Sequence, residues 1–266
     1  MTDTFVKALL HQYRDATNLN ARARLHESFS TNQYGWHPWV FDQLELPPDG
    51  RVLELGCGPG LLWRQNLDRI PHGWEVTLSD FSPGMLEDAQ RGLANADRAF
   101  RFQRIDAQQI PFADASFDAV IANHMLYHVP NRDQAIGEIR RVLHPEGQFY
   151  AATNGKNHLE DAWRFLRQTG FDPLERSFSS YPFSLENGAE QLSRHFSEVD
   201  LRRYDDALVV TEVEPVLAYV VSGIVEPERE ASELERLAEV LEGEIRDHGA
   251  IRIAKESGLF VSRGTR

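Results

Sequence analysis

Between residues 50 and 155, short apolar runs alternate with stretches in which apolar residues recur at helical spacing. The runs rich in β-branched and aromatic residues predict strands over residues 52–55, 75–79, 100–104, 119–122 and 148–152. The helical spacing predicts helices over residues 61–69, 83–93 and 132–142. Strands that alternate with helices are typical of a parallel sheet covered on both faces, so we expect a doubly wound α/β core.

Two helix boundaries carry local signals. Ser82 is a suitable N-cap and Pro83 suits the first helical position, so a helix is expected to begin there. In LHPEG, residues 143–147, Pro145 cannot continue the preceding helix and Gly147 permits a turn into the next strand.

After residue 155 the pattern is less regular. We expect helices over residues 157–169, 186–195 and 228–247, and two further strands over residues 199–204 and 259–262. The two added strands make a mostly parallel sheet of seven strands. The predicted organisation is one domain, with its parts as follows: a helical N-terminal arm or lid (1–35), a core (36–155), a helical insertion on the substrate side that includes the strand near 199–204 (156–250), and a C-terminal strand (251–266).

Composition narrows the function. The formal charge of −13 repels nucleic-acid phosphates, so a nucleic-acid partner is not expected. Cys57 is the only cysteine, which rules out an intrachain disulfide and favours a reducing compartment. No apolar run approaches the ~20 residues of a membrane helix. We expect a cytoplasmic protein without a membrane partner, as a monomer or homodimer.

The first predicted strand runs into VLELGCGPG, residues 52–60. Gly56, Gly58 and Gly60 permit a sharp turn and let a ligand approach the backbone closely. In a doubly wound sheet this strand–loop–helix unit lies where ligands bind. The loop departs from the G-x-G-x-x-G pattern of dinucleotide sites because Leu61 stands at the sixth position.

Asp80 ends the second predicted strand, about 20 residues beyond the glycine loop, where a carboxylate can meet two ribose hydroxyls. Up to this point a nicotinamide dinucleotide and other adenosine-bearing ligands fit equally well. Asp106 and Ala107 follow the third strand, and Asn123 and His124 follow the fourth, at the mouth of the same crevice.

Five segments in this order resemble the class I S-adenosylmethionine-dependent methyltransferases: VLELGCGPG, DFSPGML, DAQQIPF, SFDAVIANHMLYHV and LHPEGQFY. The resemblance spans roughly residues 34–155. It implies a Rossmann-like methyltransferase fold and an enzyme that uses S-adenosyl-L-methionine. The Asn-Pro-Pro-aromatic run of many amino-methylases of nucleic-acid bases and glutamine is absent, in agreement with the acidic charge.

The resemblance also implies which residues meet the cofactor. Gly56, Gly58 and the neighbouring backbone, including Cys57 and Gly60, would line its methionyl part, and Glu54 would organise the loop. Asp80 would bind the ribose, Phe81 and Met85 would flank the adenine, and Asp106 and Ala107 would contact its edge. Asn123 and His124 would lie near the sulfonium.

Several of these residues have simpler interpretations. Phe81 and Met85 suit the core equally well, and Cys57 is better explained as a small packing residue than as a nucleophile. His124 and His128 are four residues apart, but without a third ligand a metal site is not expected. Tyr13 or Tyr34 of the arm could cover the methyl donor as part of a lid.

Methyl transfer needs an acceptor in line with the departing sulfur, and a general base only if that acceptor is protonated. His124 and Tyr34 are the candidate bases, with His158 behind them. The acceptor site should involve the arm, the TNGKNH segment (153–158) and the insertion. A small or medium organic acceptor is expected, such as a natural product or peptide end methylated on oxygen or nitrogen; acidic residues would suit a cationic amine. A nicotinamide-dependent oxidoreductase and a non-catalytic binding module remain alternatives.

Overall fold

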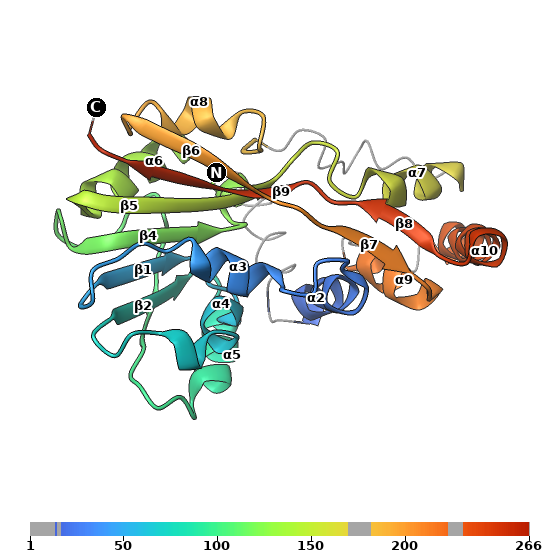
Figure 1. Cartoon of the computed structure of the whole chain (residues 1–266), viewed down its shortest axis with the longest axis horizontal. Helices are drawn as coiled ribbons and strands as arrows, with labels where there is room; N and C mark the ends of the chain where they lie inside the picture. Colours follow the sequence, from blue (N-terminus) through green and yellow to red (C-terminus); the bar gives the residue numbers. More distant parts are fainter. Residues whose placement is uncertain (1–13, 15–16, 170–181, 223–230, 266) are drawn as a thin grey trace.

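The structure is a computed structural model that describes residues 14, 17–169, 182–222 and 231–265 of the 266. Figure 1 shows a twisted central sheet. A smaller group of helices and strands lies beyond one end of its strands. The molecule thus has two parts, the sheet with its covering helices and the group of elements beyond it.

The central sheet has seven strands in the order β3-β2-β1-β4-β5-β9-β6. Its strands are β1 (Arg51–Leu55), β2 (Glu75–Asp80), β3 (Arg101–Arg104), β4 (Phe117–Asn123), β5 (Leu143–Asn154), β6 (Glu198–Tyr204) and β9 (Ser257–Arg263). All neighbours from β3 to β5 pair in parallel, whereas β9 is antiparallel to both β5 and β6. The prediction of a doubly wound, mostly parallel seven-stranded sheet is confirmed.

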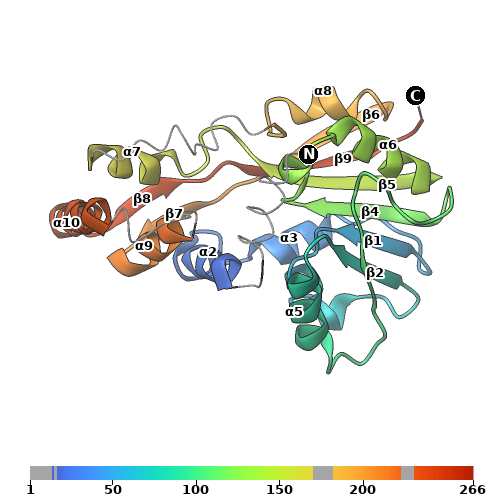
Figure 2. The same cartoon turned by 180° about the vertical axis from the view of Figure 1, so that it is seen from behind.

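Helices cover both faces of this sheet (Figure 2). On one face α6 (Arg132–Val142) and α8 (Gly188–Leu192) pack on Leu53, Val120 and Phe149. On the other face α3 (Trp36–Asp42), α4 (Leu61–Arg64) and α5 (Pro83–Leu93) pack on the alternate residues of the same strands. Strands buried on both faces explain why the sequence shows continuous apolar runs there.

The predicted start of α5 is confirmed, because the Ser82 side chain accepts a hydrogen bond from the Met85 backbone N–H and Pro83 begins the helix. The predicted helix over residues 61–69 is instead interrupted. Residues Leu67–Arg69 form a separate 3₁₀ turn, η1. The Asn66 side chain donates to the Leu62 carbonyl at 2.7 Å and competes with the helical backbone pattern.

The expected turn over residues 143–147 lies inside a strand. Leu143 pairs with Phe117 and Gln148 pairs with Ala119, so the HPEG residues form an irregularity in β5 rather than a separate loop. Pro145 is tolerated at such a bulge because it has no ladder hydrogen bond to lose. A Cβ on Gly147 would lie 3.0 Å from the Asp118 carbonyl, which explains the glycine.

The second unit, the capping lobe, lies beyond the carboxyl ends of the parallel strands. It contains α2 (Thr17–Phe29), α7 (Glu160–Gln168), β7 (Ala207–Val210), α9 (Val213–Val221), α10 (Ala231–His248) and β8 (Ile251–Ala254). Strands β7 and β8 pair with each other and continue the ribbon of β6 and β9, as Figure 1 shows. The lobe has its own apolar core, which includes Leu25, Phe165, Leu208, Val216 and Leu241.

The sequence analysis did not predict helix α3 on the sheet. In the capping lobe it did not predict β7, α9, or β8 as a separate strand. Strands β7 and β8 have four residues each, too few for a clear alternation. The run that contains α9 is apolar around its circumference, so it shows no helical stripe. The predicted helices over 157–169, 186–195 and 228–247 correspond to α7, α8 and α10 with shifted ends; residues 228–230 lie outside the described part.

Candidate active site

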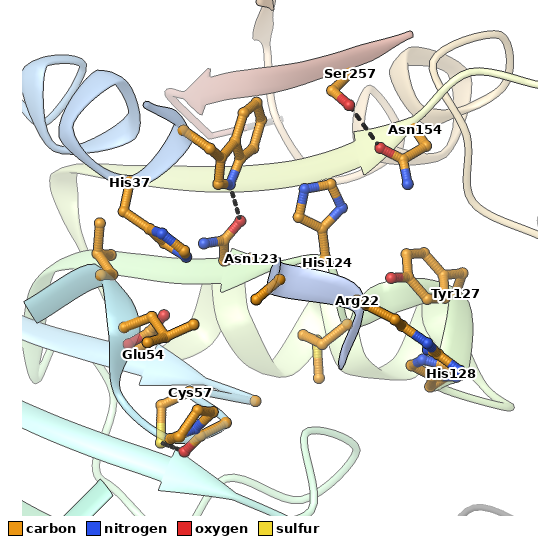
Figure 3. A pocket seen from close by; sticks show the side chains of 18 of the residues that line it. Arg22, His37, Glu54, Cys57, Asn123, His124, Tyr127, His128, Asn154 and Ser257 are labelled. Carbon is orange, nitrogen blue, oxygen red and sulfur yellow. Dashed lines mark hydrogen bonds between the residues drawn. The ribbon is translucent and has the colours of Figure 1, made fainter. Parts of the chain in front are cut away.

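A cavity of about 550 Å³ lies between the carboxyl ends of the parallel strands and the capping lobe. Its walls include the tips of β1, β2, β4 and β5 on the sheet side and residues of α2 and α9 on the lobe side. This volume lies within the ~300–1,000 Å³ typical of small-molecule sites. The cavity also lies where the strand order reverses, between β1 and β4. Figure 3 shows its lining side chains.

The glycine loop forms one wall. Gly56, Gly58 and Gly60 have φ angles of 67°, 54° and 74°, all in the left-handed region that favours glycine. A Cβ on Gly56 would lie 2.7 Å from the Cβ of Met125. Gly56 and Gly58 line the cavity, whereas Gly60 lies behind it, facing Leu93 of α5. Gly60 therefore serves the packing of α4 on α5.

Glu54, the residue before the end of β1, places a buried carboxyl group in the cavity wall. Its carboxyl oxygen accepts a 2.7 Å hydrogen bond from the Trp63 indole. Burial raises the pKa of Glu54 to about 8, against the opposing effect of the Trp63 bond, and the nearby Asp80 raises it further. A positive charge in this cavity would favour the ionised form of Glu54.

Asp80 connects the tip of β2 to the glycine loop. Its two carboxylate oxygens accept backbone hydrogen bonds from Gly58 at 2.9 Å and from Ser82 at 2.8 Å. Burial raises its pKa, and these backbone bonds oppose the rise. Since each carboxylate oxygen has two lone pairs, both oxygens can accept a further bond from a ligand.

The predicted adenine residues gather at the same side of the cavity. Phe81, Met85, Asp106 and Ala107 all line it. Met85 and Ala107 are buried, while the Arg104 guanidinium lies 5.1 Å from the centroid of the Phe81 ring. The Asp106 carboxylate accepts hydrogen bonds from the backbone and side chain of Gln108, at 2.9 and 3.0 Å. These contacts hold Asp106 in one orientation.

Asn123 and His124 end β4 at the centre of the cavity (Figure 3). Asn123 accepts a hydrogen bond from the Trp36 indole at 3.2 Å, and the Trp36 ring lies 5.0 Å from the His124 ring. His124 has a φ of 55°, a conformation that costs a residue with a Cβ roughly 1–3 kcal/mol. Packing around Trp36 and the bond from the His124 N–H to the Ala152 carbonyl hold this strained backbone.

Five of the ten histidines of the chain line this cavity, from segments far apart in the sequence. They are His26, His37, His124, His128 and His158. Burial is the largest cause of a lowered pKa at each of them, to about 3 for His26 and His124 and to about 4 for His37 and His128. The pKa of His158 is held well below its usual range. All five are therefore neutral near pH 7.

A buried ion pair closes the lobe side. Lys255 and Asp206 form a salt bridge, with side chains 8% and 0% exposed. Asp206 also accepts hydrogen bonds from the Ser30 hydroxyl at 2.6 Å and the Asn32 backbone at 3.0 Å. This pair joins the end of α2 to the β6–β7 and β8–β9 junctions.

Two predicted site residues are not found in this wall. Tyr34 is 53% exposed, does not line the cavity, and donates a 2.6 Å hydrogen bond to Asp42. This placement argues against Tyr34 as a general base, because its hydroxyl is engaged at the surface. Tyr13 lies outside the described residues. His158, in contrast, does line the cavity.

The sequence analysis did not identify His26, His37, Asp206 or Lys255 as lining residues. The sequence around these four residues contains no motif that would mark them as lining a site. Each is a polar residue next to a short apolar segment. Segments that bring them together pair only in the tertiary structure, so spacing alone could not find them. Trp36, at the start of α3, also forms part of the cavity wall.

Two further findings concern the described residues only. None of their helices is both long and apolar enough to cross a membrane. No three histidine, cysteine or acidic side chains among them are grouped so as to hold a metal ion.

Residues 53–151 match a family model described as a methyltransferase domain, and this segment carries the glycine loop and the carboxyl ends of β1, β2, β3 and β4. Residues 53–151 are thus similar to methyltransferase domains. The solved phosphoethanolamine N-methyltransferase 2 of Haemonchus contortus, in complex with phosphomonomethylethanolamine and S-adenosylhomocysteine, has a TM-score of 0.60. The match covers 100% of this chain and 61% of that one, at 17% identity, and so supports the methyltransferase fold alone.

Two methyltransferases are similar in sequence. The demethylmenaquinone methyltransferase of Beutenbergia cavernae is 34% identical over 150 residues, which cover 55% of this chain and 60% of that protein. The malonyl-[acyl-carrier protein] O-methyltransferase of Methylovorus sp. is 33% identical over 132 residues, covering 48% and 44%. The chain therefore spans less than two thirds of each relative's length.

Proposed function

We propose that this chain catalyses methyl transfer from S-adenosyl-L-methionine to a small or medium-sized organic acceptor. One observation carries the proposal: a cavity at the strand-order reversal combines a glycine-lined wall, buried carboxyl groups and a histidine-lined wall. The class I methyltransferase core and the methyltransferase relatives support it.

The residues present fit this cofactor. A sulfonium nucleoside carries positive charge but no phosphate, and it suits the sheet side of the cavity, which presents Glu54 and Asp80, whereas Arg22 and Lys255 line the lobe side. In the proposal, the Gly56 and Gly58 backbone meets the methionyl part, and Asp80 accepts hydrogen bonds from the ribose. Asp106 and Ala107 meet the adenine edge, with Phe81 and Met85 on its faces.

The cofactor, when bound, supplies a methyl group activated by a positively charged sulfur. The protein's part is to position the acceptor, since alignment alone can lower a barrier by ~7–11 kcal/mol. Trp36, Asn123 and the strained His124 backbone form a rigid wall for this purpose. The capping lobe limits water, which favours a reaction that disperses charge.

The acceptor in this proposal is methylated on oxygen or nitrogen, and natural products and peptide ends are suitable classes. The relatives are named for different acceptors, a demethylmenaquinone and a malonyl group on a carrier protein. The residues of the capping lobe, which lie outside the segment 53–151 that matches the methyltransferase-domain model, would make the choice.

Calorimetry with S-adenosylmethionine tests whether the protein binds this cofactor. Mass spectrometry of extract that has been incubated with the protein and the methyl-labelled cofactor tests whether an acceptor becomes methylated. Asp80→Ala is expected to weaken cofactor binding by roughly 1.5–3 kcal/mol, the scale of a hydrogen bond to a charged group. Asp49→Ala, at an exposed position outside the cavity, is the matched control and should bind normally. An Asp80→Ala variant with unchanged affinity would contradict the ribose role, and a protein that binds no cofactor would overturn the function.

A further inference from the structure

The wall opposite the glycine loop has an unusual composition. The histidine end, defined here as His26, His124, His158, Asp206 and Lys255, presents three imidazoles to one cavity. The His26 and His158 rings are 6.2 Å apart, and each of the three imidazoles is close enough to influence the pKa of another. No metal-binding grouping occurs among the described residues, so the cluster needs another explanation.

The hydrogen bonds around His158 determine its orientation. Its Nδ1 lies 3.1 Å from the Glu256 carbonyl oxygen and 3.5 Å from the Ser257 hydroxyl oxygen. The Ser257 hydroxyl donates its own proton to the Asn154 side chain at 2.8 Å, so it can only accept from His158. Two acceptors therefore face Nδ1, against one donor, the Glu256 N–H at 3.2 Å.

This arrangement favours the tautomer with the proton on Nδ1, and it leaves Nε2 as the acceptor atom. Asn154 and Ser257 are paired in register on β5 and β9, so the sheet itself holds the positioning group. The backbone next to His158 is also constrained, since Leu159 has a φ of 59° at the start of α7.

His26 and His124 are incompletely bonded. The Nδ1 atoms of both are shielded from solvent and have no hydrogen-bond partner among the described residues. Leaving such an atom unpaired costs roughly 1–3 kcal/mol, and a bound molecule with polar hydrogens would recover that energy. The φ of His124 lies in the left-handed region, and strained backbone of this kind is often found at functional sites.

Fixed charges at this end are balanced. Lys255 and Asp206 neutralise each other in their buried salt bridge. Arg22 donates to the Ser222 hydroxyl and carbonyl at 2.8 and 2.9 Å, and Glu27 is an exposed side chain at the cavity edge. Within the histidine end the carboxylate of Asp206 is already paired with Lys255, so an ammonium acceptor would gain no free carboxylate from this cluster and would be repelled by the neighbouring sulfonium; Glu27, at the cavity edge, accepts a hydrogen bond from Gln65 instead.

We propose, on the basis of the proposed function, that the histidine end binds a neutral acceptor with an acidic hydroxyl, such as a phenol or enol, and that His158 Nε2 removes the hydroxyl proton during methyl transfer. His26 and His124 bind the other polar groups of the acceptor. Asn154 and Ser257 are positioning residues, because they act through His158.

The step balances in atoms and charge. The O–H bond breaks and its proton goes to His158 Nε2, while the oxygen forms the new O–CH₃ bond. The C–S bond breaks and its electron pair stays on sulfur, which becomes a neutral thioether. One positive charge moves from sulfur to imidazole, so the total charge of the site is unchanged. The positive charge on sulfur disfavours a second positive charge nearby. Because that charge is lost during the transfer, a buried, weakly basic imidazole can accept the proton at the same time.

The probe is 4-nitrophenol, which ionises near neutral pH, with methyl transfer followed as formation of its methyl ether. Below the pKa of the probe a base is needed, whereas above it the phenolate already exists. His158→Gln is therefore expected to reduce the rate roughly 100-fold at the lower pH, the lower end of general-base effects, and far less at the higher pH. His72→Gln, at an exposed site outside the cavity, should match the unchanged protein.

Calorimetry with S-adenosylhomocysteine checks that His158→Gln still folds and binds the cofactor product. An equal loss of rate at both pH values would overturn the role of His158 as base. Faster methylation of 4-nitrobenzylamine than of 4-nitrophenol would overturn the acceptor class, as would no turnover of 4-nitrophenol by protein that binds the cofactor. Failure to bind S-adenosylmethionine would instead count against the proposed function itself.

Discussion

At the scale of single residues, two carboxyl groups in one cavity respond to burial. Burial raises the pKa of Glu54 to about 8 and also raises the pKa of Asp80. Each has a partner that opposes the rise, the Trp63 indole for Glu54 and backbone N–H groups for Asp80. A cationic ligand bound in the cavity would lower the pKa of both carboxyl groups and thereby favour their ionised forms.

Cofactor affinity is expected to rise with pH up to about 8, because a cation binds better once Glu54 is ionised. Below that pH, binding must release the Glu54 proton, and the affinity falls by up to about tenfold per pH unit. Calorimetry in buffers of different ionisation enthalpy measures the released proton. Glu54→Gln should remove the pH dependence, and a constant affinity in the unchanged protein would contradict the assignment.

Gly56→Ala should destabilise the protein and weaken cofactor binding. The added Cβ would lie 2.7 Å from the Met125 Cβ, and a left-handed alanine costs roughly 1–2 kcal/mol by itself. Urea unfolding measures the change in the free energy of unfolding. The control is Gly243→Ala in α10, where nothing lies within 4 Å of the new Cβ and a gain of about 0.5–1 kcal/mol is expected. Equal stability of Gly56→Ala and the unchanged protein would contradict the argument.

At the scale of elements, the ribbon of β6–β7 and β8–β9 carries the capping lobe over the strand tips. The junctions of this ribbon hold Asp206 and Lys255, and Asp206 also binds Ser30 and Asn32 just after α2. One buried ion pair thus connects three segments. Because α2 and these junctions all line the cavity, the pair influences the shape of the acceptor half.

Asp206→Asn is expected to lower the free energy of unfolding by about 3–5 kcal/mol, because it leaves Lys255 buried and unpaired. The double variant Asp206→Asn, Lys255→Met should recover part of that loss, since it removes the uncompensated charge. Denaturant unfolding near neutral pH measures both. The single variant Lys255→Met completes the comparison. If the double variant loses as much free energy of unfolding as the two single variants together, or more, the ion pair is not the cause of the loss.

At the scale of the whole molecule, three apolar cores surround one cavity, two on the faces of the sheet and one in the capping lobe. In the proposed function the sheet supplies the cofactor half of the cavity and the lobe supplies the acceptor half. The segment that matches the methyltransferase-domain model, residues 53–151, lies in the sheet part of the molecule. The exclusion of nucleic acid, the cytoplasmic location and the oligomeric state stay predictions.

Much of the sheet side could be predicted because its signals are local. Strand, loop and helix are neighbours in sequence, so the positions of the glycine loop, Asp80 and the Ser82 cap could be predicted from local signals. The same local signals did not separate Gly60, which packs behind the loop, from Gly56 and Gly58, which line the cavity. That difference depends on which side of the loop α5 occupies.

The sequence by itself determined the doubly wound core and the edge of the sheet at which a ligand can bind, because hydrophobic periodicity and turn chemistry act over a few residues. Only the tertiary structure decided that His26, His124 and His158 share one cavity, that Tyr34 faces solvent, and that Lys255 pairs with Asp206. These contacts join segments separated by long stretches of chain. Their energies depend on burial and mutual distance, and neither quantity exists until the lobe has folded against the strand tips.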